Sequence, residues 1–143
     1  MAVHQLIYSS EASKKMLKSD LYIILRQART NNKLSDVTGI LAYLDSKFIQ
    51  VLEGQKDIVA NLFKKISQDG RHHDVKLICE QDVDSRAFTS WEMAYAAPSI
   101  KDLAVWAGLH NTTTLDETLE NIKDNPGLVS EVLPKLLEHA TDI

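Results

Sequence analysis

Tyr8 and Gln50 are the two polar side chains whose positions need a chemical explanation. Tyr8 lies in an alternating, β-rich stretch and shares a strand face with Leu6. Gln50 lies between Phe48 and Leu52 on one face of another such stretch. A phenol is an oxidisable proton donor, and an amide can present either a donor or an acceptor edge. If the two strands are neighbours, the phenol and the amide can share a hydrogen bond inside an apolar layer.

Two interpretations of this pair remain open from the residues alone. A buried polar group without a partner costs about 1–3 kcal/mol, so a mutually satisfied Tyr8–Gln50 pair in the core is the simpler interpretation. The other is a ligand site. Asn31 and Asn32, at the expected end of a helix, carry amides that suit the planar edge of a heterocycle, although asparagine is also common at helix C-termini.

Other kinds of chemistry lack a sequence signature. Gly54-Gln55-Lys56 is not a phosphate-binding P-loop, and the chain shows no nucleophile elbow and no paired catalytic carboxylates. No ligand set with metal-binding spacing accompanies His72-His73, so we predict no metal site. Cys79 lies among apolar residues and is interpreted as a structural thiol. We therefore do not expect an enzyme, although the fold expected below also occurs in small hydrolases.

Hydrophobic periodicity predicts the elements that position these residues. Strands are expected at 3–9, 39–44, 47–52, 75–81 and 88–95, with a tight turn at Asp45-Ser46. Helices are expected from an N-cap at Ser19 to about residue 32, and at 57–68. This order predicts an α+β, ferredoxin-like βαββαββ sheet with two helices on one face and with its first and third strands as central neighbours.

The last part of the chain has a helical pattern. Pro98 interrupts the strand pattern, and helices are expected at 101–109, 115–122 and 128–140. We therefore predict one domain at 1–97 and a short C-terminal helical extension at 98–143. The extension is expected to cap the open face of the sheet or to form a partner surface.

Composition and charge limit the possible partners. The chain has 143 residues, 44% of them hydrophobic. No apolar run approaches the roughly 18 residues of a membrane span, and the first residues lack the pattern of a signal peptide, so we predict a cytoplasmic protein. The formal net charge is −4 and the basic residues are scattered, which argues against binding to nucleic acid.

Four short motifs, in order along the chain, resemble the signature of the BLUF family of blue-light sensors that use FAD. They are Leu6-Ile7-Tyr8-Ser9-Ser10, Asn32 followed by Val37-Thr38-Gly39-Ile40-Leu41, Phe48-Ile49-Gln50-Val51-Leu52-Glu53-Gly54, and Ser90-Trp91-Glu92-Met93. Each motif alone is weak, but together, over about residues 2–97, they are specific. The resemblance favours a ligand site over a simple buried polar pair.

The resemblance implies a flavin bound noncovalently between the two helices, with FAD expected and FMN or riboflavin as alternatives. Gln50 would bond the flavin near N5 and O4, and Tyr8 would bond Gln50. Asn32, with Asn31 nearby, would hold the C4 carbonyl and the N3 edge. The remaining contacts would come from Ile24 and Ile66 on the two sides of the ring, and from Arg29, Lys65, Asp69, Arg71 and His72 around its rim, ribityl chain or phosphates.

The family mechanism implies a light-driven switch. An electron and then a proton pass from Tyr8 through Gln50, and recombination leaves Gln50 rearranged and the flavin absorption slightly redder. Trp91 and Met93, expected on the fifth strand, are the candidates to carry this change outward, and either can occupy the position next to Gln50. Core packing is the simpler interpretation for at least one of them.

The resemblance also implies signalling rather than catalysis. The extension is too short to contain a cyclase or a phosphodiesterase, so the expected output is contact with a downstream signalling protein in trans. Short family members form homo-oligomers, and Trp106 and the apolar stripe at 128–137 are candidates for such surfaces. A flavin- or nucleotide-binding interaction module without photochemistry is the alternative, but it would have no use for the Tyr8–Gln50 pair.

Overall fold

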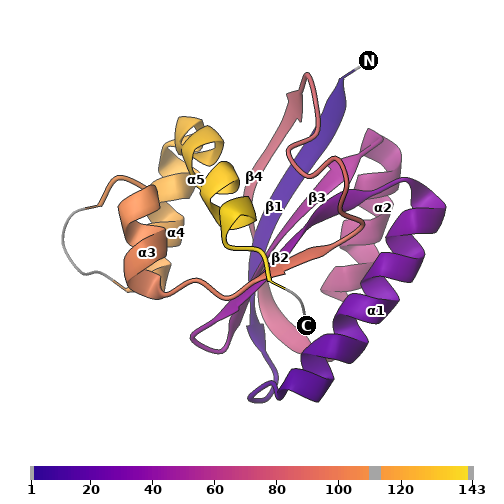
Figure 1. Ribbon diagram of the computed structural model, residues 1–143, viewed down its shortest axis with the longest axis horizontal. Coiled ribbons are helices and arrows are strands. Elements are labelled where there is room, and N and C mark those ends of the chain that lie inside the picture. Colours follow the sequence, from indigo (N-terminus) through magenta and orange to yellow (C-terminus); the bar gives the residue numbers. More distant parts are fainter. Residues whose placement is uncertain (1, 110–113, 142–143) are drawn as a thin grey trace.

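Alternating strand residues form one five-stranded sheet in the computed structural model, which describes residues 2–109 and 114–141 (Figure 1). The strands are β1 (Val3–Ala12), β2 (Thr38–Leu44), β3 (Lys47–Gly54), β4 (His72–Val83) and β5 (Ala94–Ala96). Their spatial order is β4-β1-β3-β2-β5, and all neighbours are antiparallel except β2 and β5, which are parallel. The prediction that the first and third strands are central neighbours is confirmed.

Helices cover both faces of this sheet (Figure 1). One face is covered by α1 (Lys18–Ser35) and α2 (Lys56–Ser67). The other is covered by α3 (Ile100–Trp106), α4 (Leu115–Asp124) and α5 (Val129–Glu138), with the short 3-10 helix η1 (Pro126–Leu128) before α5. The predicted α+β, ferredoxin-like sheet with a C-terminal helical extension is confirmed. None of the described helices is both long enough and apolar enough to cross a membrane.

The pleat of the central strands divides the interior into two apolar layers. Leu6 and Tyr8 of β1 belong to the layer covered by α1 and α2, whereas Ile7 belongs to the layer beneath the C-terminal helices. In β3, Leu52 belongs to the first layer and Val51 to the second. The predicted alternation of the two strands is therefore confirmed.

The apolar stripe of α5 is part of the second layer. Its buried side chains pack with those of the sheet and of α3 and α4: Val129, Val132, Leu133 and Leu136. Trp106 is half-buried, and its ring lies beside that of His139 at a centroid distance of 4.8 Å. The expectation that the stripe forms a partner surface is wrong, because a sheet covered on both faces uses it as core.

The start of α1 differs from the prediction. The carboxylate of Asp20 accepts a hydrogen bond from the backbone N–H of Leu17 at 2.9 Å. This bond satisfies a donor at the start of the helix, so that Ser19 is a residue of the first turn and not the N-cap.

The end of α1 also lies further along the chain than predicted. The helix continues to Ser35, and Asp36 then adopts a φ angle of 55°, the left-handed conformation that ends many helices. Asn31 and Asn32 therefore lie within the last turns of α1, where their side chains project from the helix surface, and not at its C-terminus.

The fifth strand is shorter than predicted: most of the predicted range, 88–95, lies outside any strand. The backbone N–H groups of Ala87 and Phe88 donate to the carboxylate of Glu53, at 2.8 and 2.9 Å. The N–H of Trp91 then donates to the carbonyl of Phe88 at 3.1 Å, which turns the chain. Trp91 and Met93 precede β5 and do not share a strand face.

A two-residue turn sets the register of β2 and β3. Asp45 and Ser46 have positive φ angles, 52° and 59°, which is the conformation of a type I′ hairpin turn. With this turn, Leu41 pairs with Gln50 across β2 and β3, and Gln50 pairs with Tyr8 across β3 and β1. The predicted hairpin is present, and it aligns the two polar residues of the central strands.

Gly39 of β2 provides a test of how closely β2 and β3 must approach. A Cβ atom added at Gly39 would lie 1.9 Å from the carbonyl oxygen of Val51. We expect Gly39→Ala to lower the free energy of unfolding by at least about 2 kcal/mol, because the strands must separate to relieve the overlap. Urea denaturation measures this change.

Gly127→Ala is the matched control, because an added Cβ there meets no atom within 4 Å. We expect it to change the free energy of unfolding by less than about 0.5 kcal/mol. Equal effects of the two substitutions would contradict the importance of this close approach.

Candidate functional site

The centre of the candidate site is a hydrogen bond between two buried side chains. Tyr8 and Gln50 face each other directly across β1 and β3, and the Tyr8 hydroxyl donates to Gln50 Oε1. The two side chains are 3% and 5% exposed. Burial, together with the nearby charge of Asp69, raises the pKa of Tyr8 above its ordinary value. Tyr8 is therefore a neutral phenol, and its hydroxyl donates a hydrogen bond to the amide oxygen.

Met93 completes the contacts of the Gln50 amide. Gln50 Nε2 lies 3.6 Å from Met93 Sδ, and Met93 is 1% exposed. A thioether is a weak acceptor, so one end of the amide has a strong partner and the other a weak one. Trp91 is 37% exposed and is not part of the apolar layer that contains Met93. Of the two residues that the sequence left open, Met93 occupies the position next to the amide.

The last helical turns of α1 hold the backbone around Met93. Asn32 Nδ2 donates to the carbonyl of Glu92 at 2.6 Å, and Arg29 Nε donates to the carbonyl of Met93 at 2.9 Å. Arg29 was predicted to contact a cofactor, but its guanidinium group is directed to this carbonyl and does not line the cavity described next. It fixes the residue that touches Gln50.

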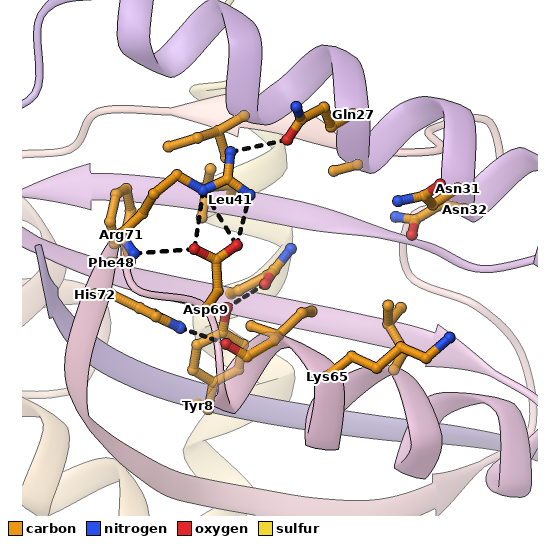
Figure 2. Close-up of a pocket in the computed structure, with 15 residues that line it drawn as sticks. Tyr8, Gln27, Asn31, Asn32, Leu41, Phe48, Lys65, Asp69, Arg71 and His72 are labelled. Atoms are coloured by element: carbon orange, nitrogen blue, oxygen red, sulfur yellow. Dashed lines mark hydrogen bonds and ion pairs between the residues drawn. The ribbon is translucent and has the colours of Figure 1, made fainter.

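A cavity of about 220 Å³ opens between α1 and α2, and Tyr8 and Gln50 are part of its lining (Figure 2). All residues that the sequence proposed as cofactor contacts line it except Arg29: Ile24, Asn31, Asn32, Gln50, Lys65, Ile66, Asp69, Arg71 and His72. Tyr8 lines it as well. The structure thus brings together side chains from β1, β3, both helices and the turn after α2.

The lining also includes residues that were not predicted, namely Gln27, Ala28, Leu41, Phe48 and Leu62. Helical spacing was a usable signal for some of them, because Gln27 and Ala28 lie three and four positions after Ile24 and share its face. Strand pairing was the signal for Leu41, which is the β2 neighbour of Gln50. Neither signal distinguishes a cavity wall from ordinary core packing.

An ion pair and a hydrogen bond close one end of the cavity (Figure 2). Arg71 Nη2 lies 2.6 Å from Asp69 Oδ2, and Arg71 Nη1 donates to Gln27 Oε1 at 2.8 Å. The side-chain hydrogen bond from Arg71 lowers the pKa of Asp69 below its ordinary value. This cluster connects the turn after α2 to α1 and presents a guanidinium group at the rim.

His72 is buried at the same end of the cavity. Its Nε2 donates to the carbonyl of Ile66 at 2.6 Å, because a carbonyl can only accept, and its Nδ1 lies 2.7 Å from the Ser10 hydroxyl. These bonds tie α2 to β1 and β4. Its neighbour His73 lies outside the cavity, in a group of possible metal ligands with Glu11 and Asp74, whose ligand atoms are within 4.8 Å of one another. No metal was predicted, and that absence stays a prediction.

The lining suits a flat heteroaromatic group. Ile24 of α1 and Ile66 of α2 provide apolar walls from the two covering helices. The amides of Asn31, Asn32 and Gln50 offer both donors and acceptors, which is what the edge of a heterocycle with carbonyl and ring-nitrogen atoms requires. Lys65 and Arg71 add positive charge for an anionic substituent. The residues present therefore fit a flavin.

Comparison with known proteins gives both family and structural matches. Residues 3–94 match the family model described as BLUF, sensors of blue-light using FAD. The chain is 39% identical over 92 residues to photoactivated adenylate cyclase subunit beta of Euglena longa. The aligned region covers 64% of this chain and 11% of that protein. It therefore spans only about a tenth of this curated relative.

Two solved structures resemble the chain over nearly its whole length. BlsA in its photo-activated state is 29% identical, with 99% of each chain covered and a TM-score of 0.79. BlrB, a BLUF protein in its dark state, is 26% identical, with 96% of each chain covered and a TM-score of 0.72. The similarity to these structures includes the C-terminal helices as well as the sheet.

The rim ion pair predicts a change in the titration of Asp69. We expect Arg71→Gln to raise the pKa of Asp69, because the substitution removes the hydrogen bond and the positive charge that hold it low. NMR titration of the Asp69 carboxyl group measures this shift. Arg26→Gln, on the exposed side of α1, is the matched control and should leave the titration of Asp69 unchanged.

The same ion pair predicts a direction for the dependence of stability on pH. The folded-state pKa of Asp69 lies below its unfolded value of about 3.9, so the stabilisation is complete above that pH and is lost as the pH falls through the folded value. The stability difference between wild type and Arg71→Gln should therefore shrink below about pH 4. A difference that stayed constant from neutral pH to acid would contradict this assignment.

Proposed function

The chain belongs to the BLUF family of blue-light sensors that use FAD, and from this premise we propose that it is a photoreceptor whose switch is the Tyr8–Gln50 pair. One observation carries the proposal: a buried phenol donates to a buried amide at the floor of a cavity that fits a flavin. A stable core has no need of this pair beside a cavity, whereas a light-driven proton transfer needs both groups in contact.

In the proposed switch, bound FAD supplies light absorption and an oxidising excited state. Tyr8 supplies the electron and the proton. Burial raises the pKa of Tyr8, so the phenol keeps its proton in the dark and releases it only when the tyrosine side chain is oxidised. Its hydroxyl donates to Gln50 Oε1, which gives the proton a direct path to the amide.

Gln50 is the element with two states. We assign to the dark state the arrangement in which the Gln50 oxygen accepts from Tyr8 and the Gln50 nitrogen faces the thioether of Met93. If the amide turns or tautomerises, Met93 faces a different group and Tyr8 loses or exchanges its acceptor. The two states therefore differ in their contact with Met93, which is the condition for the change at Gln50 to bias the neighbouring backbone. We assign Trp91 no direct contact with Gln50 in the dark.

We propose that the flavin ring lies between Ile24 and Ile66, with its polar edge toward Asn31, Asn32 and Gln50. The rim residues Lys65, Asp69, Arg71 and His72 would hold the ribityl chain or the phosphates. The lining of the cavity supports these assignments. Because the ring contacts are the same for all flavins, FMN and riboflavin are expected to enter the same cavity, with FAD preferred as the cofactor of the family.

We propose that the signal passes by contact to a downstream signalling protein in trans, with residues 1–97 as the sensor and residues 98–143 as the part that transmits it. The packing of α3, α4 and α5 on the second face of the sheet supports this division. We assign no catalysis to the chain itself, because it spans only a small part of the relatives that are named as cyclases, 11% of the one from Euglena longa. A homo-oligomer that changes with light is the expected form of the receptor.

The visible spectrum before and after blue light tests the cofactor and the switch together. We expect the FAD-loaded protein to shift its long-wavelength band reversibly and slightly to the red, a small effect because only hydrogen bonds to the ring change. In Gln50→Leu the flavin should bind but the band should stay in place, since leucine has no amide to rearrange.

Gln68→Leu is the matched control, because Gln68 is exposed at the end of α2. It should shift like the wild type. A protein that binds flavin but shows no shift would favour the interaction module without photochemistry. A protein that cannot be loaded with any flavin would overturn the proposal and leave Tyr8 and Gln50 as an ordinary core pair.

A further inference from the structure

Glu53 is a fully buried carboxylate on β3, with 0% of its surface exposed. Its two oxygens accept from Gln5 Nε2 at 2.9 Å, from Thr38 Oγ1 at 3.4 Å, and from the backbone N–H groups of Ala87 and Phe88 at 2.8 and 2.9 Å. A buried carboxylate is very unfavourable unless donors surround it. The donors here come from β1, β2 and the chain after β4, so Glu53 joins parts of the fold that are distant in sequence.

Glu53 lies in the middle of a polar row that crosses the sheet. On one side, Gln5 Oε1 accepts from Gln81 Nε2 at 3.0 Å. On the other side, Thr38 Oγ1 accepts from Arg86 Nη1 at 3.0 Å. The row therefore links four neighbouring strands, β4, β1, β3 and β2, to the chain that follows β4. A satisfied buried network of this kind favours one arrangement of the parts that it joins.

The 86–93 segment leads from this row to the candidate site. Phe88 is buried in the layer beneath the C-terminal helices, whereas Met93 is buried in the layer covered by α1 and α2. Between them, the carbonyl of Trp91 accepts from the N–H of Gly39 at 3.1 Å. The segment thus passes from one apolar layer to the other, with Glu53 holding its beginning and Gln50 touching its end.

We propose that Glu53 is a positioning residue that holds the 86–93 segment so that Met93 lies against Gln50, and that it thereby sets how long the light state persists. Glu53 does not touch the cavity and acts through Met93. The statement about the light state rests on the proposed function, whereas the statement about the position of Met93 does not.

The arrangement of the donors explains why a carboxylate is required at this position. The N–H of Ala87 donates to Oε2, and the N–H of Phe88 donates to Oε1. A glutamine has a single acceptor oxygen, so in either orientation its NH₂ group would face one of these N–H groups. The substitution Glu53→Gln therefore places two donors against each other and loosens one of the two bonds, although the side chain keeps its size.

The first test concerns the dark protein and needs no light. The sequence contains three methionines, Met1, Met16 and Met93, so methyl NMR of methionine can follow Met93 directly. In Glu53→Gln we expect the Met93 methyl signal to move or to split, because the segment occupies more than one position. Gln5→Leu is the matched control, since it removes a donor to the same carboxylate from the side of β1 and should leave the Met93 signal in place.

The second test is the rate at which the FAD-loaded protein returns to the dark spectrum. We expect this rate to rise about tenfold in Glu53→Gln, the effect of losing roughly one charge-assisted hydrogen bond. When the 86–93 segment is loosened, the Gln50 amide can return to its dark arrangement with less accompanying movement of the backbone around Met93. In Gln5→Leu the rate should stay within about twofold of the wild type, because that bond does not hold the segment.

Arg86→Gln keeps the inference testable if Glu53→Gln does not fold. Arg86 anchors the same segment from outside, through bonds to the carbonyls of Asp36 and Glu53 at 2.8 and 3.2 Å. We expect Arg86→Gln to shift the Met93 methyl signal in the same direction as Glu53→Gln does. An unchanged Met93 signal in folded Glu53→Gln or Arg86→Gln would overturn the positioning role. A wild type without a light response would overturn the proposed function, and the Met93 signal would still decide the positioning role.

Discussion

The hydrogen bond between Tyr8 and Gln50 is the interaction on which the other features of the site depend. It lies inside an apolar layer, where neither group has access to water, so each must find its partner in the protein. That requirement is met only if β1 and β3 are adjacent and in the observed register. The cavity, the thioether of Met93 and the backbone contacts of α1 are all arranged around this bond.

Tyr8, at the floor of the cavity, interacts electrostatically with the Asp69–Arg71 ion pair at its rim. Asp69 forms its ion pair with Arg71 at the rim, yet its charge also contributes to the raised pKa of Tyr8 at the floor. Arg71 in turn keeps the carboxyl group of Asp69 ionised. A ligand that competes for Arg71 would therefore alter the field at the phenol without touching it. Burial remains the larger cause of the raised pKa.

Residues with periodic patterns were predictable from the sequence, and residues held by isolated long-range bonds were not. The alternation in β1 and β3 indicated the faces of Tyr8 and Gln50, and the helix pattern indicated Ile24 and Ile66. The motifs pointed to the correct family. The choice of Met93 over Trp91 has no such signal.

The shortened β5 and the bond from Arg29 to the carbonyl of Met93 lacked a sequence signal for the same reason. The path of the chain before β5 depends on two backbone N–H groups that bond the carboxylate of Glu53, more than thirty positions earlier in the sequence. Arg29 bonds a backbone carbonyl that only this path brings near. Neither arrangement leaves a trace in hydrophobic periodicity.

The type I′ turn at Asp45-Ser46 has a further consequence, because a single inserted or deleted residue that shifted β3 by one position would exchange its two sides. Gln50 would then leave the layer covered by α1 and α2, and Ile49 or Val51 would take its place opposite Tyr8. The length of this hairpin is therefore a condition for the contact between Tyr8 and Gln50, and natural variation in this protein should spare it even where the turn residues themselves change.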